Sequence, residues 1–405
     1  MAYGRARLQE LGFGELARCI RGGPAVRESA ESAWRRAGVL ELTGWPDGPP
    51  VVPRAPIPAC MDGAMSALCA LAPQAPGLLD LARAGGAALL GERNVPADPP
   101  AKRPLRRRGR RTASGGGRLL RAQDGWLAVN LPRGPEDEHL LPAWLETEGT
   151  PEDPWSQLER VLPERRVALW LERARWLGLA VAGARRPGAI EPRWCRVQRL
   201  REPGPARSVQ ADLRVLDLSS LWAGPLCSRL LGLAGGRVVK VESRGRPDGA
   251  RQGSPLFFER MNGAKEQVAL DLPQPSAVAL LRELLEEADI VVESSRPRAL
   301  AQMGIDAAAW VAARPGRTWV ALSGYGRREP QAQWVAFGDD AAAAAGLCWC
   351  VPPAHAPLFV GDATADPVAG LHAALAALAA WRHGGGVLLD VPLAACVARC
   401  LWRGR

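Results

Sequence analysis

Lysine is almost missing from this sequence, because only three of its 52 basic residues are lysine and the others are arginine. The chain has a formal net charge of +10. Arginine matches phosphate oxygens with parallel N–H groups, so the excess suits a phosphate-bearing ligand, and it also suits nucleic acid. Alanine, glycine and proline are abundant too, which is typical of a GC-rich genome. The charge alone therefore does not identify the partner.

Long hydrophobic runs and metal-binding motifs are also missing. No apolar run approaches the roughly 18 residues of a membrane helix, and the start "MAYGRARLQELGF" lacks the apolar core of a signal peptide. We therefore expect a cytoplasmic protein with no membrane partner. The nine cysteines and four histidines include no C-x-x-C pair and no H-E-x-x-H run, so we expect no metal and reduced, buried thiols.

The last 200 residues alternate short β-branched runs with helical ones. The runs that predict strands are 214–220, 237–243, 289–295, 318–324 and 386–392, and residues 275–288 predict a helix. This rhythm predicts an α/β fold with a Rossmann-like open parallel sheet. No G-x-G-x-x-G follows the first strand and no Walker A sequence occurs, which argues against an ordinary dehydrogenase or NTPase.

Ligands of open α/β sheets bind at the carboxyl ends of the strands. These ends are rich in serine, glycine and arginine, and they lie at 219–225, 242–246, 293–298 and 323–327. Such residues suit an anionic ligand, although polar turns that lead into helices have the same composition. The sequence therefore places a candidate site at this edge of the sheet and leaves both interpretations open.

Two segments, 33–72 and 341–380, resemble each other. When Gly63 is aligned with Gly370, Asp366 falls opposite Ala59. Only the later copy has a carboxyl group there, so we interpret the pair as a duplication followed by decay. From the residues alone, Asp366 is also explained as a helix N-cap followed by Pro367 at the first helical position. Asp339 and Asp340 are expected as the N-cap and first turn of another helix, and Asp362 as a loop residue.

Two segments rich in proline, glycine and arginine predict domain boundaries. The first, 94–117, has no apolar periodicity and no interleaved aromatic residues that would stack on bases. We interpret it as an exposed linker rather than a nucleic-acid arm, and we expect no nucleic-acid partner. The second, 201–209, precedes the change to the strand–helix pattern.

Residues 213–399 resemble the family III CoA transferases, which include formyl-CoA transferase and carnitine CoA-transferases and have alpha-methylacyl-CoA racemase as a relative. Six blocks occur in the family's order: "RVLDLSSLWAGP", "RVVKVES", "NGAKEQVALDL", "ADIVVESSRPRALAQMGID", "ALSGYGR" and "DPVAGLHAALAALAAWR". The resemblance implies coenzyme A, carried as an acyl-CoA, and a carboxylic acid as substrates. It also implies that Asp366, in the motif D-x-x-x-G, attacks the thioester and forms an aspartyl mixed anhydride.

The resemblance further implies a set of positions around the CoA. They are Leu221, Trp222, Ala223, Gly224, Ser243, Arg244, Leu270, Ser294, Ser295, Ala299 and Met303. Arg244 and Arg246 are the candidates for phosphate contacts. Phe337 stands where the racemases have a histidine, and a phenyl ring cannot move a proton. Racemisation is therefore disfavoured, and Phe337 is expected to line the acyl or pantetheine site.

Segments 115–133 and 172–187 resemble parts that normally follow the family's core, but here they precede it. We therefore expect a rearranged tandem fusion with four parts: a degenerate partial core repeat (1–93), a linker (94–117), a smaller α+β domain with a return segment (118–205) and the family core (206–405). The family's interlocked dimer implies a homodimer or a single-chain pseudo-dimer. A non-catalytic acyl-CoA-binding protein and an acyl-CoA racemase or isomerase remain open as alternatives.

Overall fold

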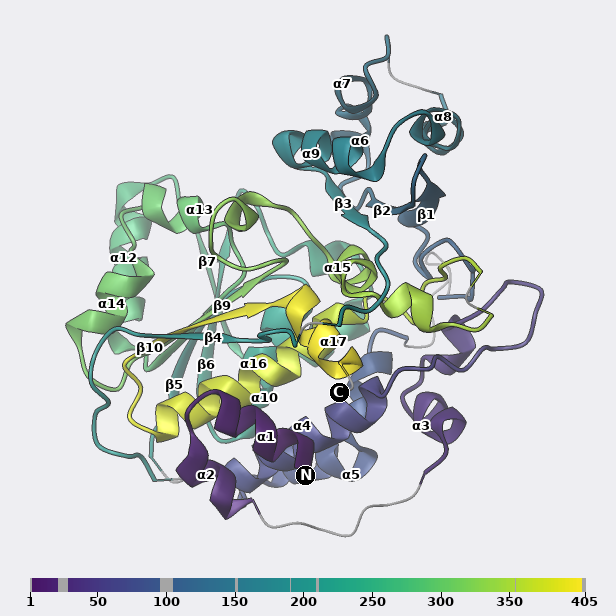
Figure 1. The fold of residues 1–405 in the computed structure, drawn as a ribbon. Helices are drawn as coiled ribbons and strands as arrows, with labels where there is room; N and C mark the ends of the chain where they lie inside the picture. Colours follow the sequence, from purple (N-terminus) through teal and green to yellow (C-terminus); the bar gives the residue numbers. More distant parts are fainter. Residues whose placement is uncertain are drawn as a thin grey trace.

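A seven-stranded sheet forms the centre of the computed structural model, which describes residues 2–20, 28–94, 105–149, 152–189, 191–208, 211–353 and 355–402 (Figure 1). The strand order is β4-β10-β9-β8-β5-β6-β7. All neighbours are parallel except β4, which is antiparallel to β10. The strands are β4 (Arg196–Arg199), β5 (Arg214–Leu218), β6 (Arg237–Ser243), β7 (Glu266–Leu270), β8 (Ile290–Glu293), β9 (Thr318–Ser323) and β10 (Val387–Pro392).

The five predicted strand runs are confirmed as β5, β6, β8, β9 and β10. Strand β4 lies within the segment 118–205 that was assigned to the smaller domain, yet it forms the edge of the large sheet. Its sequence, Arg-Val-Gln-Arg, has no apolar alternation. Its pairing with β10, and not its own pattern, makes it a strand.

The strand order places a switch point between β5 and β8. From β5 the chain continues to β6 and β7 on one side, then returns to add β8, β9 and β10 on the other. This is the Rossmann order, in which loops leaving the two central strands diverge and open a crevice at their carboxyl ends.

Helices cover both faces of the large sheet (Figure 1). One side carries α10 (Ala223–Leu233), α16 (Ala365–Arg382) and α17 (Leu393–Leu401); the other carries α12 (Pro275–Glu287), α13 (Pro297–Gln302) and α14 (Ala307–Ala313). Successive residues of β9 point to opposite sides, since Val320 joins the first core and Trp319 joins the second. The shorter elements η4 (Gly249–Gln252) and α11 (Pro255–Asn262) connect β6 to β7.

The N-terminal segment packs on the outer side of α16 and α10 (Figure 1). Its elements are α1 (Ala2–Glu10), α2 (Gly14–Cys19), α3 (Ala30–Arg36), η1 (Leu40–Leu42), α4 (Ile57–Leu71), α5 (Pro76–Ala84) and η2 (Gly86–Gly91). Helix α16 is therefore enclosed, and every residue in it except Asp366 and Arg382 is buried. The N-terminal segment shares one hydrophobic core with the C-terminal region.

A smaller α+β domain projects from the large one, at the top of Figure 1. Its sheet contains β1 (Gly117–Arg121), β2 (Trp126–Asn130) and β3 (Ala180–Gly183), all antiparallel. Its helices are α6 (Pro135–Glu138), α7 (Leu141–Leu145), α8 (Pro154–Val161), η3 (Leu162–Glu164) and α9 (Val167–Leu177). Trp144 and Trp170 pack edge to face in its separate core, with ring centroids 5.9 Å apart. The expected smaller domain is thus present.

The segment 94–117 is not the exposed linker that its composition predicts, at least where it is described. The guanidinium of Arg107 donates to the carbonyl oxygens of Trp45, Glu41 and Gly48 at 2.8–2.9 Å. Thr112 and Ala113 are buried. The hydrogen bonds of arginine side chains hold this segment in place. Because such bonds need no apolar periodicity, its absence wrongly predicted an exposed linker. Residues 95–104 of the expected linker lie outside the described residues.

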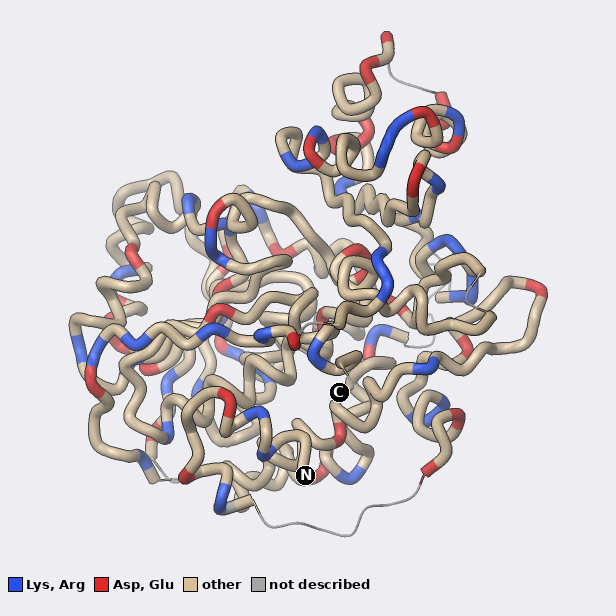
Figure 2. The backbone as a smooth tube through the Cα atoms, in the orientation of Figure 1, with Lys and Arg blue, Asp and Glu red and all other residues tan. Residues whose placement is uncertain are grey.

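Basic residues are distributed over every part of the fold and are not confined to one element (Figure 2). No described helix combines the length and the apolarity needed to cross a bilayer.

Candidate active site

A cavity of about 310 Å³ opens at the switch point of the large sheet. The loops after β5, β8 and β9, the loop before α15 (Gly338–Ala345), the start of α16 and one residue of the smaller domain surround it. Its lining includes Arg133, Ser220, Leu221, Ala223, Gly224, Arg246, Ser294, Ser295, Arg296, Ser323, Gly324, Arg327, Trp334, Phe337 and Asp366. The strand ends named from the sequence therefore meet at one site.

The structure brings eight of the predicted site residues together around this cavity. They are Leu221, Ala223, Gly224, Arg246, Ser294, Ser295, Phe337 and Asp366. The other six, Trp222, Ser243, Arg244, Leu270, Ala299 and Met303, are not part of its lining. Trp222 is buried with its ring against Phe257. Leu270 and Met303 belong to the core beneath α12, so their contacts in this structure are with the protein interior.

Asp366 is the second residue of α16 and not its N-cap. The helix begins at Ala365, with Thr364 in the N-cap position. The N-cap interpretation of Asp366 was therefore wrong, because the helix starts two residues earlier than the proline indicated. Since all other residues in the first four turns of α16 are buried, Asp366 is the side chain by which this helix reaches the cavity.

The carboxyl group of Asp366 lies where the N-termini of α10, α15 and α16 come together. A Cβ atom on Gly338, the first residue of α15, would lie 2.1 Å from Asp366 Oδ2, so only glycine leaves room for the carboxyl there. A Cβ atom on Gly370 would lie 2.6 Å from the carbonyl oxygen of Ala223, which shows how closely α10 approaches α16. Helix N-termini carry partial positive charge and unpaired N–H groups, so their convergence favours negative charge at this point.

Burial raises the pKa of Asp366 to about 7. The carboxyl group of Asp362 raises it further, whereas Arg93 and the backbone N–H groups of Ala223 and Gly338 lower it. At neutral pH the carboxyl is thus divided between its acid and its ionised form. A desolvated carboxylate that is available at neutral pH is a better nucleophile than one surrounded by water.

Three further carboxyl groups support the backbone around Asp366. Asp339 accepts a hydrogen bond from Ala363 N at 2.8 Å, and Asp340 accepts one from Phe337 N at 2.9 Å. Asp362 is ion-paired with Arg93 at 2.9 Å. Asp362 lies in the loop before α16, as expected. The N-cap expectation for Asp339 was wrong: Phe337 is the N-cap residue of α15, and both Asp339 and Asp340 lie in its first turn.

Four arginines surround the cavity, and two of them have no ion-pair partner among the described residues. Arg133 is bonded to Asp137, with Nε 2.7 Å from Oδ1, and Arg327 is ion-paired with Glu293. Arg246 and Arg296 are the unpaired ones. Burial lowers the pKa of Arg296, and the positive charges of Arg298, Arg133 and Arg246 lower it further. An anion bound here would relieve this repulsion between like charges.

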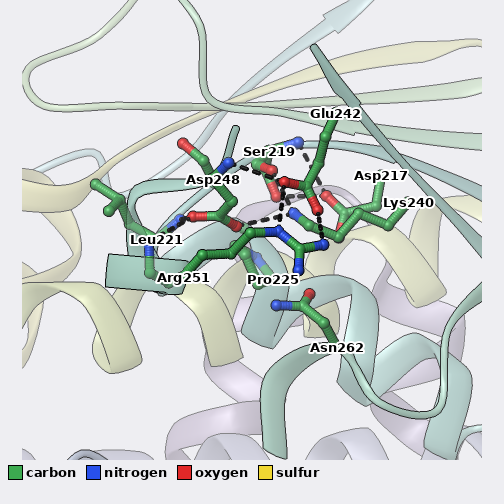
Figure 3. Close-up of polar contacts among 12 residues, drawn as sticks. Asp217, Ser219, Leu221, Pro225, Lys240, Glu242, Asp248, Arg251 and Asn262 are labelled. Atoms are coloured by element: carbon green, nitrogen blue, oxygen red, sulfur yellow. Dashed lines mark hydrogen bonds and ion pairs between the residues drawn. The ribbon is translucent and has the colours of Figure 1, made fainter. Parts of the chain in front are cut away.

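A buried polar network fixes the turn between β5 and α10 (Figure 3). Lys240 Nζ donates to the Ser219 carbonyl at 2.8 Å and is ion-paired with Asp248 at 3.0 Å. Asp248 Oδ1 accepts from Leu221 N at 2.8 Å, which holds Leu221 at a φ of 69°. This backbone conformation is uncommon for a residue with a side chain, so the network maintains a strained turn at the rim of the cavity.

The same network holds the first turn of α10. Lys265 Nζ contacts Asp217 Oδ2 at 2.9 Å and the Pro225 carbonyl at 3.0 Å. Burial alone would raise the pKa of Asp217, but the ammonium groups of Lys265 and Lys240 lower it well below its ordinary value. Two of the chain's three lysines, Lys240 and Lys265, therefore stabilise this one turn, whereas nearly all other basic residues of the chain are arginine.

The sequence analysis did not single out Arg133, Arg296, Arg327 or Trp334 as site residues. Arg296 and Arg327 lie within the strand ends that were expected to bind an anion, so that signal was available. Arg133 reaches the cavity from the smaller domain. The way the smaller domain packs on the large one carries no local sequence signal, which is why this residue was missed.

These features define an α/β domain with a cavity at its switch point, which a partly buried carboxyl group and four arginines line. Residues 211–402 match the family model described as CoA-transferase family III. Just under half of the chain is therefore similar to CoA-transferase family III.

Named relatives match just under half of the chain. The chain is 31% identical over 192 residues to the succinyl-CoA–D-citramalate CoA-transferase of Chloroflexus aurantiacus, covering 44% of this chain and 48% of the relative. It is 30% identical over 201 residues to the succinyl-CoA:glutarate CoA-transferase of Mus musculus, covering 47% and 46%. A solved CAIB/BAIF family protein from Brucella suis is 25% identical, with coverage of 48% and 55% and a TM-score of 0.43. The chain thus spans about half the length of the curated relatives that it matches.

Proposed function

We propose that this protein is a CoA transferase that moves CoA from an acyl-CoA to a carboxylic acid, with Asp366 as the covalent nucleophile. The position of the Asp366 carboxyl, on the cavity wall at the junction of three helix N-termini, carries this proposal. The match of residues 211–402 to the model of CoA-transferase family III supports the same reaction class.

The reaction begins when an Asp366 oxygen attacks the thioester carbonyl carbon. The C–S bond breaks, CoA leaves as a thiolate, and an aspartyl acyl anhydride remains. The thiolate then attacks the aspartyl carbonyl, releases the donor acid and leaves an aspartyl thioester. The acceptor carboxylate attacks this thioester, so that its C–S bond breaks, CoA leaves again as a thiolate and a second anhydride forms. The thiolate then attacks the acceptor acyl carbonyl of this anhydride, which forms the new acyl-CoA and expels Asp366 as a carboxylate. No proton is gained or lost overall, and Asp366 is restored as a carboxylate.

Each step develops negative charge near Asp366, and the chain offers groups that stabilise it. The backbone N–H groups of Ala223 and Gly338 lie at the helix N-termini beside the carboxyl. Arg246 and Arg296 are the residues that would bind the phosphates of CoA, because they are unpaired and line the cavity. Phe337 lines the cavity as well, and a phenyl ring provides an apolar wall but no proton relay.

The experiment that tests this proposal is covalent trapping. The protein is incubated with succinyl-CoA and hydroxylamine, and the mass of the peptide that contains Asp366 is measured. We expect a hydroxamate on that peptide, and we expect Asp366→Asn to lose both the adduct and at least about 10³-fold of CoA exchange. Asp80→Asn is the matched control, because Asp80 is a surface aspartate on α5.

An isotope provides a second test. An acceptor acid labelled with ¹⁸O in its carboxylate should leave one labelled oxygen in Asp366, because the acceptor oxygen attacks the aspartyl carbonyl. CoA binding without adduct, label or exchange over a broad panel of donors would instead favour a non-catalytic acyl-CoA-binding protein. Exchange of the substrate's α proton with deuterium, without CoA transfer, would favour a racemase or isomerase.

We infer, as a second proposal, that the N-terminal segment takes the place of part of a second subunit, so that the chain is a single-chain pseudo-dimer. The support is its packing on α16 within a shared core and the likeness of 33–72 to 341–380. Analytical ultracentrifugation tests this inference, which requires a 43.3 kDa monomer to be fully active. Activity that appears only as the chain dimerises would contradict it.

A further inference from the structure

A buried pair of cysteines lies where the first and last helices of the described chain meet (Figure 1). Cys60 is near the start of α4, and Cys400 is at the end of α17. The Sγ atom of Cys60 lies 3.9 Å from the carbonyl oxygen of Cys400, and the hydroxyl of Tyr3, on α1, lies 3.3 Å from Cys400 Sγ. None of the three residues lines the Asp366 cavity, so the proposed reaction does not use them.

Two buried arginines lie beside this pair, Arg7 on α1 and Arg399 on α17. Their side chains are 3% and 8% exposed, and both contact the same oxygen of Glu10, at 2.6 and 2.7 Å. Arg399 also contacts Glu191 at 3.1 Å, but that carboxylate is 52% exposed. The Nε atoms of both arginines have no hydrogen-bond partner among the described residues. Two buried guanidinium groups that share one carboxylate oxygen favour a further negative charge beside them.

These surroundings give the two thiols different properties. The hydrogen bond with the Cys60 thiol has the largest effect on the pKa of Cys400 and lowers it, whereas burial raises it. The contact with Tyr3 and the charges of the two arginines lower this pKa as well. The same hydrogen bond raises the pKa of Cys60, and so does burial. Cys400 is thus the thiol that ionises, with the protonated Cys60 beside it. A thiolate in contact with a second thiol is typical of cysteines that are oxidised reversibly.

Two neighbouring cysteines show that burial alone does not produce these properties. Cys69 also lies on α4, and its Sγ is 3.7 Å from the carbonyl oxygen of Leu78. Burial raises the pKa of Cys69 to about 11, so it remains a thiol at neutral pH. Cys396 lies one turn before Cys400, but its Sγ is 3.5 Å from the carbonyl oxygen of Trp194, and burial raises its pKa.

We propose that Cys60 and Cys400 are a site of reversible oxidation, where hydrogen peroxide converts the two thiols into a disulfide between α4 and α17. The Cys400 thiolate attacks one peroxide oxygen, so that an S–O bond forms, the O–O bond breaks and hydroxide leaves. The hydroxide takes up the proton that the thiol had released. The Cys60 sulfur then attacks the sulfenic sulfur; an S–S bond forms, the S–O bond breaks, and hydroxide leaves with the Cys60 proton. The cysteines lose two electrons, and the peroxide is reduced to two water molecules.

This disulfide would fasten the N-terminal segment to the last helix of the described chain. Helix α4 shares a hydrophobic core with α16 and α17, so the bond would lie inside an existing contact. The two cysteines are 340 residues apart in the sequence. A bond that closes so long a loop restricts the unfolded chain, and oxidation is therefore expected to stabilise the fold.

Peptide mapping of the full chain tests the site. The reduced protein is treated with hydrogen peroxide, the remaining thiols are alkylated, and the digest is analysed by mass spectrometry. We expect one linked pair of peptides, which contains Cys60 and Cys400 and which dithiothreitol separates. Cys69→Ala is the matched control and should leave the link unchanged. In Cys60→Ser, oxidation should stop at a sulfenic acid on Cys400, which dimedone labels. A folded protein with neither link nor label, or a link from Cys400 to Cys396, would overturn the proposal.

The rate of labelling tests whether Cys400 reacts as a thiolate. In the Cys60→Ser background, Arg7→Met should slow dimedone labelling about 10-fold, because a rise of one unit in the pKa of the thiol lowers its thiolate fraction that much. Arg7→Lys keeps the positive charge and should restore most of the rate. Circular dichroism establishes that each variant is folded. An unchanged rate in folded Arg7→Met would contradict the proposed activation of Cys400.

Urea denaturation measures the consequence for the fold. The oxidised protein should unfold at a higher urea concentration than the reduced protein, and Cys60→Ser treated with peroxide in the same way should show no shift. A midpoint that stays or falls on oxidation would contradict a disulfide that the folded arrangement accommodates. Neither measurement depends on CoA exchange, so the inference stands or falls separately from the proposed function.

Discussion

The two segments that resemble each other in sequence, 33–72 and 341–380, fold in the same order of elements. In the first, α3 ends near Gly38 and is followed by η1 and then α4; in the second, α15 ends at Gly346 and is followed by η6 (Leu347–Cys350) and then α16. Both glycines have a positive φ, 72° and 100°. Each long helix is also crossed by another helix at its aligned glycine, α4 by α1 at Gly63 and α16 by α10 at Gly370.

The two copies differ in what surrounds the start of the long helix. Ala59, near the start of α4, is exposed to solvent, whereas Asp366 faces a cavity formed by strand ends of the sheet and by the N-terminus of α10. The helix, short turn and long helix that both copies contain therefore serve to pack helices against one another. The proposed chemistry needs a carboxyl group at the edge of a parallel sheet, and of the two copies only the second has both.

The largest effect is expected from the network that fixes α10 in the second copy. Lys265→Met removes the partner of Asp217 and leaves a buried charge without full compensation. We expect the free energy of unfolding to fall by about 3–5 kcal/mol, measured by urea denaturation. Arg237→Met on β6 is the control, because its ion pair with Glu266 is exposed and should contribute less than about 1 kcal/mol. Equal losses in both variants would mean that the network does not hold the turn.

Adding one methyl group at the aligned glycines distinguishes the copies directly. Gly370→Ala pushes α10 away from α16, because the new Cβ would lie 2.6 Å from the Ala223 backbone oxygen. A displacement near 1 Å at the N-terminus of α10 should slow CoA exchange about 10²-fold. In Gly63→Ala the three atoms nearest to the new Cβ all belong to the Tyr3 side chain, and the closest is Tyr3 Cβ at 2.9 Å. We expect that variant to lose stability but to keep its exchange rate per folded molecule, and a similar slowing in both would contradict the division of roles.

The sequence predicted the large sheet well because its strands are β-branched runs separated by clear helical patterns. The residues of β5, β8 and β9 are buried on both faces, so their pattern depends little on distant partners. The sequence-based prediction failed at β4 and at the segment around Arg107. At both places hydrogen bonds to backbone that is distant in the sequence determine the structure.

The part of the site that could be predicted consists of residues at the carboxyl ends of the parallel strands, because the strand order brings these ends together. Asp366 and the residues after β5 and β8 follow from the D-x-x-x-G motif and the Rossmann rhythm. Arg133 does not, because it comes from a separate domain whose contact with the core has no local signal. The role of Gly338 was also hidden, since the space that it leaves for Asp366 Oδ2 exists only in three dimensions.

A smaller effect is expected in the dependence of stability on pH. The folded state raises the pKa of Asp366 to about 7, against 3.8 for an ordinary aspartate. The folded protein therefore holds this proton more tightly than the unfolded chain does, so the stabilisation is present below pH 4 and is lost as the pH rises through 7.

Asp366→Asn removes the loss of stability that the unmodified protein shows as the pH rises through 7. Because the side chain of Asp366 lines the cavity and is not fully buried, we expect the variant to gain about 1–2 kcal/mol over the unmodified protein at pH 8 and much less at pH 4. Chemical denaturation at both pH values measures the difference. A constant difference between pH 4 and pH 8 would show that the pKa of Asp366 is not raised.

The smallest effect is expected when the missing carboxyl group is restored to the first copy. Ala59→Asp places an aspartate in the first turn of α4, where the helix dipole should stabilise the fold by about 0.3–1 kcal/mol. It should restore no CoA exchange in an Asp366→Ala background, because the position is exposed and neither the sheet rim nor the N-terminus of α10 lies beside it. Hydroxylamine trapping on the peptide that contains position 59 measures this directly. An adduct there would show that the helical unit alone can activate a carboxylate, and the distinction between the two copies would then lie in one side chain.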